Sequence, residues 1–144
     1  MKVLVTGGLG FVGSNLVDIL VSRGEEVCVI DDLSSGSKVW INENASYIFE
    51  DVQNINVNLK NDFDIIFHLA AEARIQPSFL NPLRWQQSNI NGTSAICEFA
   101  RENNSKVVLA GSSSCYGGKF MNPYTFSKKI SEEICEMYSR VFGL

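Results

Sequence analysis

Thr6-Gly7-Gly8-Leu9-Gly10-Phe11-Val12-Gly13 is the stretch of sequence that decides the fold. It directly follows an apolar run at 2–6 and opens a segment of helical periodicity at 11–23. Its glycines fit both G-x-G-x-x-G and G-x-x-G-x-x-G, which allow a tight turn, close approach of a pyrophosphate and an open helix N-terminus. The preceding strand and the following helix favour a dinucleotide-binding loop over a merely structural glycine turn.

Short apolar runs alternate with helical segments along the chain, which is typical of βαβ units in a parallel sheet. The sequence predicts strands at 2–6, 26–31, 46–50, 64–68 and 106–110. It predicts helices at 11–23, 82–103 and 124–142, and a loop or one irregular turn at 54–61. These elements predict one α/β domain over residues 1–144, a Rossmann-like doubly wound parallel sheet with strand order 3-2-1-4-5 flanked by helices.

Composition excludes several classes of protein. The 144 residues, 45% of them hydrophobic, suffice for one core, and the net charge of −4 argues against binding to nucleic acid or an anionic membrane. No apolar run reaches the roughly 18 residues of a membrane span. The four cysteines form no CxxC pair and His68 is the only histidine, which argues against a metal site. Free cysteines suit a reducing compartment, so a cytoplasmic location is predicted.

Asp31 closes the second predicted strand, 18 residues after Gly13. An acidic side chain at this place can accept hydrogen bonds from the adenosine ribose and would repel a 2′-phosphate, which favours NAD over NADP. The alternative is that Asp31 and Asp32 only cap the turn that runs to Gly36.

Tyr124 and Lys128 are four residues apart near a helix start, so their side chains project from one face. An ammonium group beside a phenol favours the phenolate, which is a competent general base. Ser112 follows the fifth predicted strand, at the edge where open parallel sheets bind ligands, and its hydroxyl can hold a substrate oxygen. The alternatives are a surface pair of little consequence and a plain serine-rich turn.

Two further segments follow predicted strands at the same edge. Asp51-Val52 comes after the third strand and Leu69-Ala70-Ala71 after the fourth. Small residues at 70 and 71 would let the backbone approach a cofactor, with plain close packing as the alternative.

These motifs together resemble those of the extended short-chain dehydrogenase/reductases, chiefly the NAD-dependent nucleotide-sugar epimerases and dehydratases such as the UDP-glucose 4-epimerases. The similarity runs over the whole chain. Four cofactor-binding motifs of the family are matched: the glycine loop at 6–13, the ribose-binding turn at 31–36, the adenine-contacting pair at 51–52 and the segment under the cofactor at 68–71. Three further motifs are matched by N-x-x-G-T at 89–93, a stretch similar to S-x-x-V-Y-G at 112–117 and Y-x-x-S-K at 124–128.

The resemblance implies a site and a reaction. Tyr124 would take a proton from a sugar hydroxyl while NAD takes the hydride, giving a transient 4-keto sugar. Ser112 would orient the hydroxyl, and Lys128 would bind the nicotinamide ribose and assist Tyr124. The implied cofactor-binding residues are Gly7, Gly10, Phe11, Val12, Gly13, Asp31, Asp32, Ser34, Asp51, Val52, Leu69, Ala70, Ala71, Asn89, Tyr124 and Lys128.

The chain departs from the family's pattern in ways that shape the expected function. Ser113 and Ser114 stand where the 4,6-dehydratases carry an Asp-Glu pair, so epimerisation or reduction is favoured over loss of water. Only 11 residues separate Ser112 from Tyr124, fewer than is usual in the family. The family would continue after 144 into a portion that binds the nucleotide sugar, so we expect the cofactor half to be complete and the substrate-binding portion to be absent.

Two functions are therefore expected to compete. The first is an NAD-dependent nucleotide-sugar epimerase with its catalytic residues in place. The second is a non-catalytic NAD-binding module, or half of a split enzyme that another chain completes. The resemblance also implies a homodimer formed through the helices at 82–103 and 124–142.

Overall fold

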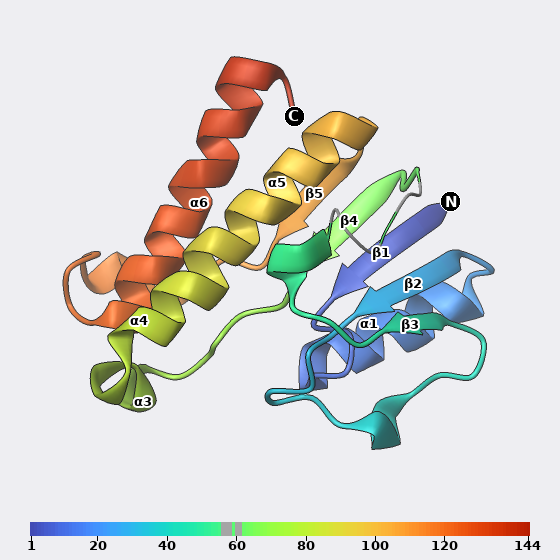
Figure 1. Cartoon of the computed structure of the whole chain (residues 1–144), viewed down its shortest axis with the longest axis horizontal. Coiled ribbons are helices and arrows are strands. Elements are labelled where there is room, and N and C mark those ends of the chain that lie inside the picture. Colours follow the sequence, from blue (N-terminus) through green and yellow to red (C-terminus); the bar gives the residue numbers. More distant parts are fainter. Residues whose placement is uncertain (56–58, 60–61) are drawn as a thin grey trace.

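A five-stranded parallel sheet lies at the centre of the fold (Figure 1). The structure is a computed structural model that describes residues 1–55, 59 and 62–144. The strand order, β3-β2-β1-β4-β5, is the predicted 3-2-1-4-5, so the predicted fold is confirmed. The strands are β1 (Lys2–Thr6), β2 (Glu26–Ile30), β3 (Ser46–Ile48), β4 (Ile65–His68) and β5 (Lys106–Leu109).

The carboxyl ends of all five strands are level with one another. Thr6 pairs with Ile30 on one side and with His68 on the other, and the outer strands continue this row through Ile48 and Leu109. Because the strands are parallel and end in register, the loops that follow them meet at one edge of the sheet. All the predicted motifs lie on or just after these strand ends or on the helices beside them.

Helices cover both faces of the sheet (Figure 1). α1 packs against β1 and β2 on one face, and α5 packs against β4 and β5 on the other, with α6 alongside α5. The longer helices are α1 (Phe11–Ser22), α5 (Gly92–Asn103) and α6 (Pro123–Phe142); the short ones are α3 (Ile75–Leu80), α4 (Pro82–Trp85) and the single turns η1 (Lys38–Trp40), η2 (Val52–Asn54) and η4 (Ser113–Gly117).

The predicted helix at 82–103 is present but not uniform. It consists of α4, a π-helical stretch η3 (Gln86–Asn91) and α5 in direct succession. The sequence did not predict α3, which precedes it. Of the predicted loop at 54–61, residues 56–58, 60 and 61 lie outside the described residues, and Asn54 belongs to η2.

Alternating side chains of the strands build a core on each face of the sheet. Val3 and Val5 of β1 pack with Val17 and Leu20 of α1, whereas Leu4 belongs to the core beneath α5. These residues are at most 6% exposed, so the central strands are buried on both faces, as their continuous apolar runs predict. The same prediction is wrong for the outer strands β3 and β5, which contain no buried residue, because each has a neighbouring strand on one side only. The result is a rigid scaffold that holds the loops at the carboxyl edge.

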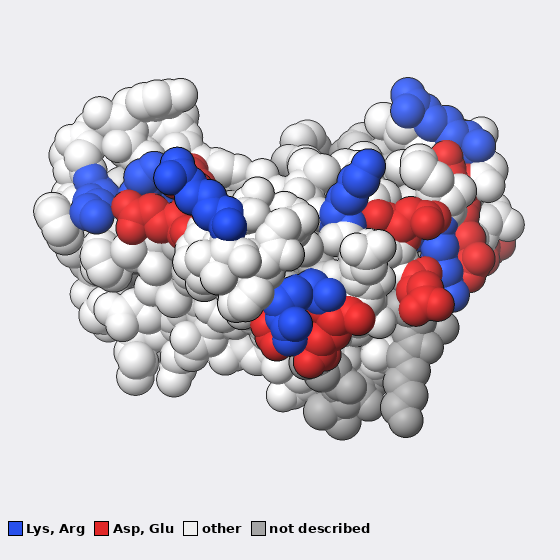
Figure 2. All heavy atoms as spheres, turned by 90° about the horizontal axis from the view of Figure 1, so that it is seen from above, with Lys and Arg blue, Asp and Glu red and all other residues white. Residues whose placement is uncertain are grey.

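The surface charges are mixed. Figure 2 shows acidic and basic side chains beside one another on the face that it presents. Ion pairs such as Lys129 with Glu132 and Lys119 with Glu133 account for part of this mixing. Among the helices of the described residues, none combines the length and apolar character needed to cross a membrane.

Candidate functional site

A pocket of about 260 Å³ lies at the carboxyl edge of the sheet, between the loops that follow β1, β2, β3 and β4. Most of the predicted cofactor residues line it, namely Gly7, Gly10, Phe11, Val12, Gly13, Asp31, Asp32, Ser34, Asp51, Val52, Leu69, Ala70 and Ala71. The lining also includes Ser35, Glu50, Ala73 and Ser88, which the sequence analysis did not name.

The glycine loop forms one wall of the pocket, and two of its glycines are needed for steric reasons. Gly7 has a φ of +69°, and a Cβ there would lie 2.7 Å from the backbone nitrogen of Ala70. A Cβ on Gly13 would lie 2.7 Å from Cα of Gly8. Gly10 differs, because its Cβ would meet only the carbonyl oxygen of Gly7, at 3.4 Å, and would fit. Gly7 and Gly13 are thus required by the fold, and Gly10 is not.

The N-terminus of α1 opens into this pocket. Gly10 is the N-cap residue, no side chain caps the helix, and no acidic residue lies in its first turn. The amide groups of Phe11, Val12 and Gly13 are therefore available to a ligand, and the positive end of the helix dipole favours an anion. This arrangement fits the pyrophosphate of a dinucleotide.

Asp31 both shapes the loops and lines the pocket. Its carboxylate is 6% exposed and accepts hydrogen bonds from the amides of Leu9 and Leu33, both at 2.9 Å. Asp32 accepts from the amide of Ser34 at 2.9 Å. The capping interpretation is therefore correct for both residues. It does not exclude the ribose role, because a carboxylate has about four acceptor positions and Asp31 uses two of them here.

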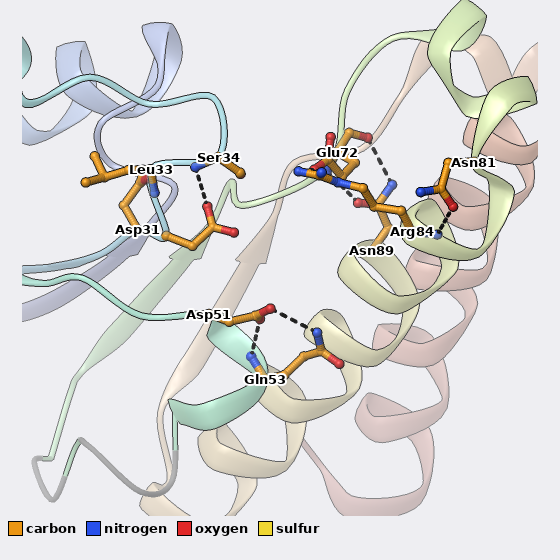
Figure 3. A network of polar contacts seen from close by, with 10 residues as sticks. Asp31, Leu33, Ser34, Asp51, Gln53, Glu72, Asn81, Arg84 and Asn89 are labelled. Carbon is orange, nitrogen blue, oxygen red and sulfur yellow. Dashed lines mark hydrogen bonds and ion pairs between the residues drawn. The ribbon is translucent and has the colours of Figure 1, made fainter.

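The loop after β3 brings two further carboxylates to the pocket. Asp51 caps η2 by accepting from the backbone and side chain of Gln53, at 2.9 and 3.1 Å (Figure 3). Glu50 accepts from Asn54 at 3.0 Å and from the amide of Asp51 at 2.9 Å, and these hydrogen bonds lower the pKa of Glu50. A charged Glu50 therefore lies on the pocket wall, and only its place after a strand could have indicated this.

The predicted catalytic residues meet beside the end of β5. The hydroxyl of Tyr124 donates to Oγ of Ser112 at 3.3 Å, and Nζ of Lys128 donates to the carbonyl oxygen of Ala110 at 2.6 Å. Lys128 is 5% exposed, and this burial lowers its pKa. The structure thus brings Ser112 and Tyr124 into direct contact, while none of the three residues lines the 260 Å³ pocket.

The start of α6 is held from outside the helix. The amide of Tyr124 donates to Oγ of the buried Ser78 on α3 at 3.2 Å, and Asn122 caps the helix by accepting from the amide of Thr125 at 2.8 Å. Ser78 fixes the backbone from which the Tyr124 side chain extends. Sequence reasoning missed it because α3 itself was not predicted.

Asn89 joins the segment after β4 to α6. Its side chain is 1% exposed, accepts from the amide of Glu72 at 2.8 Å, and donates to the carbonyl of Glu72 at 3.1 Å and to Oγ of Ser127 at 2.9 Å. Figure 3 shows this side chain directed at Glu72. Its neighbour Ser88 lines the pocket, whereas Asn89 is absent from the lining, so its predicted cofactor contact stays a prediction.

Comparison with known proteins places the chain in a family. Residues 3–144 match the model of the NAD dependent epimerase/dehydratase family. The chain belongs to this family. The match confirms both the resemblance found in the sequence and the predicted cofactor, NAD.

Individual relatives are similar over nearly the whole chain. UDP-glucuronic acid decarboxylase 1 of Danio rerio is 31% identical over 165 residues, covering 99% of this chain and 39% of the relative. UDP-glucose 4-epimerase of Streptococcus mutans is 28% identical over 163 residues, covering 100% of this chain and 49% of the relative.

Solved structures have the same fold. The UDP-glucose 4-epimerase of Thermotoga maritima with UDP-glucose has a TM-score of 0.94 at 29% identity, and covers 100% of this chain with 53% of its own. That of Brucella ovis in complex with NAD has a TM-score of 0.90 at 26% identity, with coverages of 99% and 49%. The chain spans about half the length of these proteins.

Proposed function

We propose that this chain is the NAD-binding portion of a nucleotide-sugar epimerase, an oxidoreductase and isomerase that works through a transient 4-keto sugar. The observation that carries the proposal is the 3.3 Å contact between Tyr124 and Ser112, two hydroxyl groups placed at the same sheet edge as the pocket. We further propose that residues 1–144 form the NAD-binding unit and that the substrate-binding part lies outside them.

NAD fits the pocket in three respects. The open N-terminus of α1 suits the pyrophosphate, the free acceptor positions of Asp31 suit the adenosine ribose, and the pocket wall at Gly10 has room that a side chain would fill. The other lining residues of the loops, including Asp51 and Val52, would contact the adenine end. When bound, NAD supplies a hydride acceptor and, later, the hydride donor.

The chain's own residues would handle the proton. Tyr124 would accept the proton of the sugar hydroxyl, and Ser112, whose Oγ it already contacts, would hold that hydroxyl in place. Lys128 would present its ammonium group beside the same site, since Nζ donates to the carbonyl oxygen of Ala110 just after β5, and its positive charge would favour the phenolate. These three residues perform no step that needs an acidic partner at 113 or 114.

Epimerisation is the reaction that these residues favour. Oγ of Ser114 lies 2.9 Å from Oγ of Ser112, so neutral hydroxyl groups occupy the place next to the reacting centre. Because residues 113 and 114 are serines, they supply no carboxyl group to act as the acid or base in the elimination of water. The names of the relatives support a UDP-sugar as substrate, because both the epimerase and the decarboxylase act on one.

One observation favours the second candidate, an NAD-binding module without activity of its own. The pocket contains the dinucleotide residues but none of Ser112, Tyr124 and Lys128. Exposed apolar side chains lie close in sequence to the catalytic residues, with Tyr116 94% and Phe120 81% exposed. A further chain segment or a partner would complete a substrate site against such a surface.

Calorimetry with NAD tests the proposal. We expect the wild-type chain and Glu43→Gln, an exposed control, to bind NAD, and Asp31→Ala and Gly10→Val to lose at least about tenfold in affinity. Unchanged affinity in both variants would overturn the cofactor site. A panel of UDP-, GDP- and dTDP-sugars then separates the two candidates, because only the epimerase yields reduced nicotinamide or an isomerised sugar.

Two other features belong to the same proposal. A homodimer would form through α5 and α6, where Met137, Val141 and Phe142 are 43%, 65% and 53% exposed. Light scattering that shows a monomer at high concentration would refute it. A cytoplasmic location is supported by the four free cysteines.

A further inference from the structure

His68 lies at the centre of a buried hydrogen-bond chain beneath the pocket. It is the only histidine of the sequence and is 2% exposed at the end of β4. Its Nδ1 is 2.7 Å from Oγ1 of Thr6 on β1, and its Nε2 is 3.1 Å from Oγ1 of Thr93 on α5. The imidazole therefore links β1, which leads into the glycine loop, to α5.

The direction of these hydrogen bonds follows from Thr6. Its Oγ1 accepts from the amide of Ala70 at 3.0 Å and from the amide of Leu69 at 3.2 Å, and Leu69 shares its hydrogen with the carbonyl oxygen of Thr6, also at 3.2 Å. A hydroxyl oxygen has two lone pairs, and both are used by these amides, so its own hydrogen is left to donate to Nδ1 of His68. Nδ1 must then be unprotonated, and the hydrogen on Nε2 donates to Thr93.

We propose that His68 is a positioning residue, held as the neutral tautomer with its proton on Nε2, which fixes the floor of the NAD pocket through Thr6. The inference rests on the proposed function for its effect on NAD. The tautomer itself is a property of the chain alone.

The floor of the pocket, formed by Leu69 and Ala70, is in contact with the glycine loop. The tautomer of His68 therefore affects the position of both segments. Leu69 and Ala70 line the pocket, and a Cβ on Gly7 would lie 2.7 Å from the nitrogen of Ala70. If the Thr6 hydroxyl turned its hydrogen toward the amides, Ala70 would lose its acceptor, Leu69 would keep only the backbone oxygen of Thr6, and the segment at 69–70 would shift against the glycine loop. His68 prevents this by accepting that hydrogen.

A proton on Nδ1 is excluded by the same geometry. It would face the Thr6 oxygen, both of whose lone pairs are already used. Burial, together with the charge of Lys128, lowers the pKa of His68 to about 3, so the imidazole stays neutral in the folded chain. His68 is thus a fixed acceptor and donor rather than an acid or base.

Nitrogen NMR of the chain without NAD tests the tautomer. With ¹⁵N-histidine labelling, the only imidazole gives two resonances, and coupling to the ring hydrogens distinguishes Nδ1 from Nε2. We expect a protonated Nε2 and a bare Nδ1, unchanged over about pH 5 to 8, where an ordinary histidine titrates. A protonated Nδ1, or averaged resonances, would overturn the proposal.

Two matched variants test the positioning. Thr6→Ser keeps the hydroxyl, and we expect its affinity for NAD to stay near that of the wild type. Thr6→Val leaves the amide of Ala70 without its acceptor and the amide of Leu69 with the backbone oxygen alone, and should weaken NAD binding about tenfold. Folded Thr6→Val with unchanged NAD affinity contradicts the role of His68. Should Thr6→Val fail to fold, the wild-type spectrum still decides the tautomer. A wild-type chain that does not bind NAD refutes the proposed function instead.

Discussion

The hydroxyl group of Tyr124 contacts Oγ of Ser112 across 3.3 Å, which joins the first turn of α6 to the loop after β5. Oγ of Ser112 also caps η4 by accepting from the amide of Ser114 at 3.3 Å. Ser112 is thus held by its own turn while Tyr124 reaches it from a helix that Ser78 anchors. A substrate hydroxyl that bound between the two would find an acceptor and a donor already oriented.

This relationship predicts different effects for two small changes. Tyr124→Phe removes only the phenolic oxygen, so we expect NAD affinity within about threefold of wild type. In the enzyme that includes the proposed substrate-binding part, we expect a loss of epimerisation of about 10²–10⁴-fold, the range for a missing general base. Ser112→Ala should lose less, about tenfold, because it removes orientation alone. Isomerised sugar is measured by chromatography. A Tyr124→Phe variant with wild-type turnover would contradict the assignment.

Much of the fold could be predicted because its signals are local. The five apolar runs stand out in the sequence, and the glycine loop fixes where β1 ends and α1 begins. α3 escaped prediction because Ile75–Leu80 is one short turn with a proline inside. The π-helical stretch also escaped, because it accompanies the contacts of Asn89 with Glu72 and Ser127, residues distant in sequence.

The site could be predicted to a similar degree for the same reason. Most of the motif residues follow strand ends, so knowing the strands places them at one edge, whereas Asn89, Tyr124 and Lys128 lie on helices. Ser78 and Glu50 carry no motif, and their roles arise only where the folded chain brings them to Tyr124 and to the pocket. The Thr6 to His68 hydrogen bond likewise spans 62 residues of sequence and leaves no local trace.

Gly10 and Gly13 predict a separation of ligand binding from folding. Gly10→Ala should keep the melting temperature within about 2 °C, because its Cβ has room, yet weaken NAD binding about tenfold by filling the pyrophosphate position. Gly13→Ala should destabilise the fold by about 1–3 kcal/mol, since its Cβ overlaps the backbone of Gly7 and Gly8. Thermal melts and calorimetry measure both. Equal losses of stability in the two variants would refute the distinction.

Asp31 predicts the choice between NAD and NADP. Asp31→Asn removes the negative charge that would repel a 2′-phosphate. We expect affinity for NAD to fall about tenfold, and the ratio of the NAD affinity to the NADP affinity to fall by more than about tenfold. The variant also leaves one of the amides of Leu9 and Leu33 without its acceptor, which costs about 1–2 kcal/mol of stability. Glu43→Gln, an exposed loss of the same charge, is the control. An unchanged ratio would remove Asp31 from the ribose site.

Lys128 predicts a gain of stability when function is lost. Burial lowers the pKa of Lys128, so the folded chain holds this proton less tightly than the unfolded chain, and the cost lasts until the pH rises toward the ordinary value of about 10.5. Lys128→Met should therefore raise the free energy of unfolding at pH 7 by about 1 kcal/mol, an advantage that shrinks near pH 10. The ammonium group of Lys129 is 3.1 Å from Glu132 and more exposed, so Lys129→Met should show no gain in the free energy of unfolding. A lower melting temperature for Lys128→Met at pH 7 would contradict the argument.

His68 predicts how stability depends on pH. Its pKa of about 3 in the folded chain lies below the ordinary value near 6.5, so the unfolded chain takes up a proton first as the pH falls. The free energy of unfolding should then decrease by about 1.4 kcal/mol per pH unit below pH 6.5. Carboxylates with lowered pKa values, such as Glu50 and Glu98, contribute only below their ordinary range near pH 4.5.

The window from about pH 6.5 to 5 therefore isolates the only histidine. His68→Gln carries no titrating group, so its free energy of unfolding, measured by urea denaturation, should be nearly level across this window even if it is lower throughout. Thr93→Ser keeps both His68 and a hydroxyl partner and should retain the wild-type slope. A wild-type chain whose stability is constant from pH 6.5 to 5 would show that the folded imidazole takes up a proton as readily as the unfolded one; both ring nitrogens would then donate, and Nδ1 could not accept from Thr6.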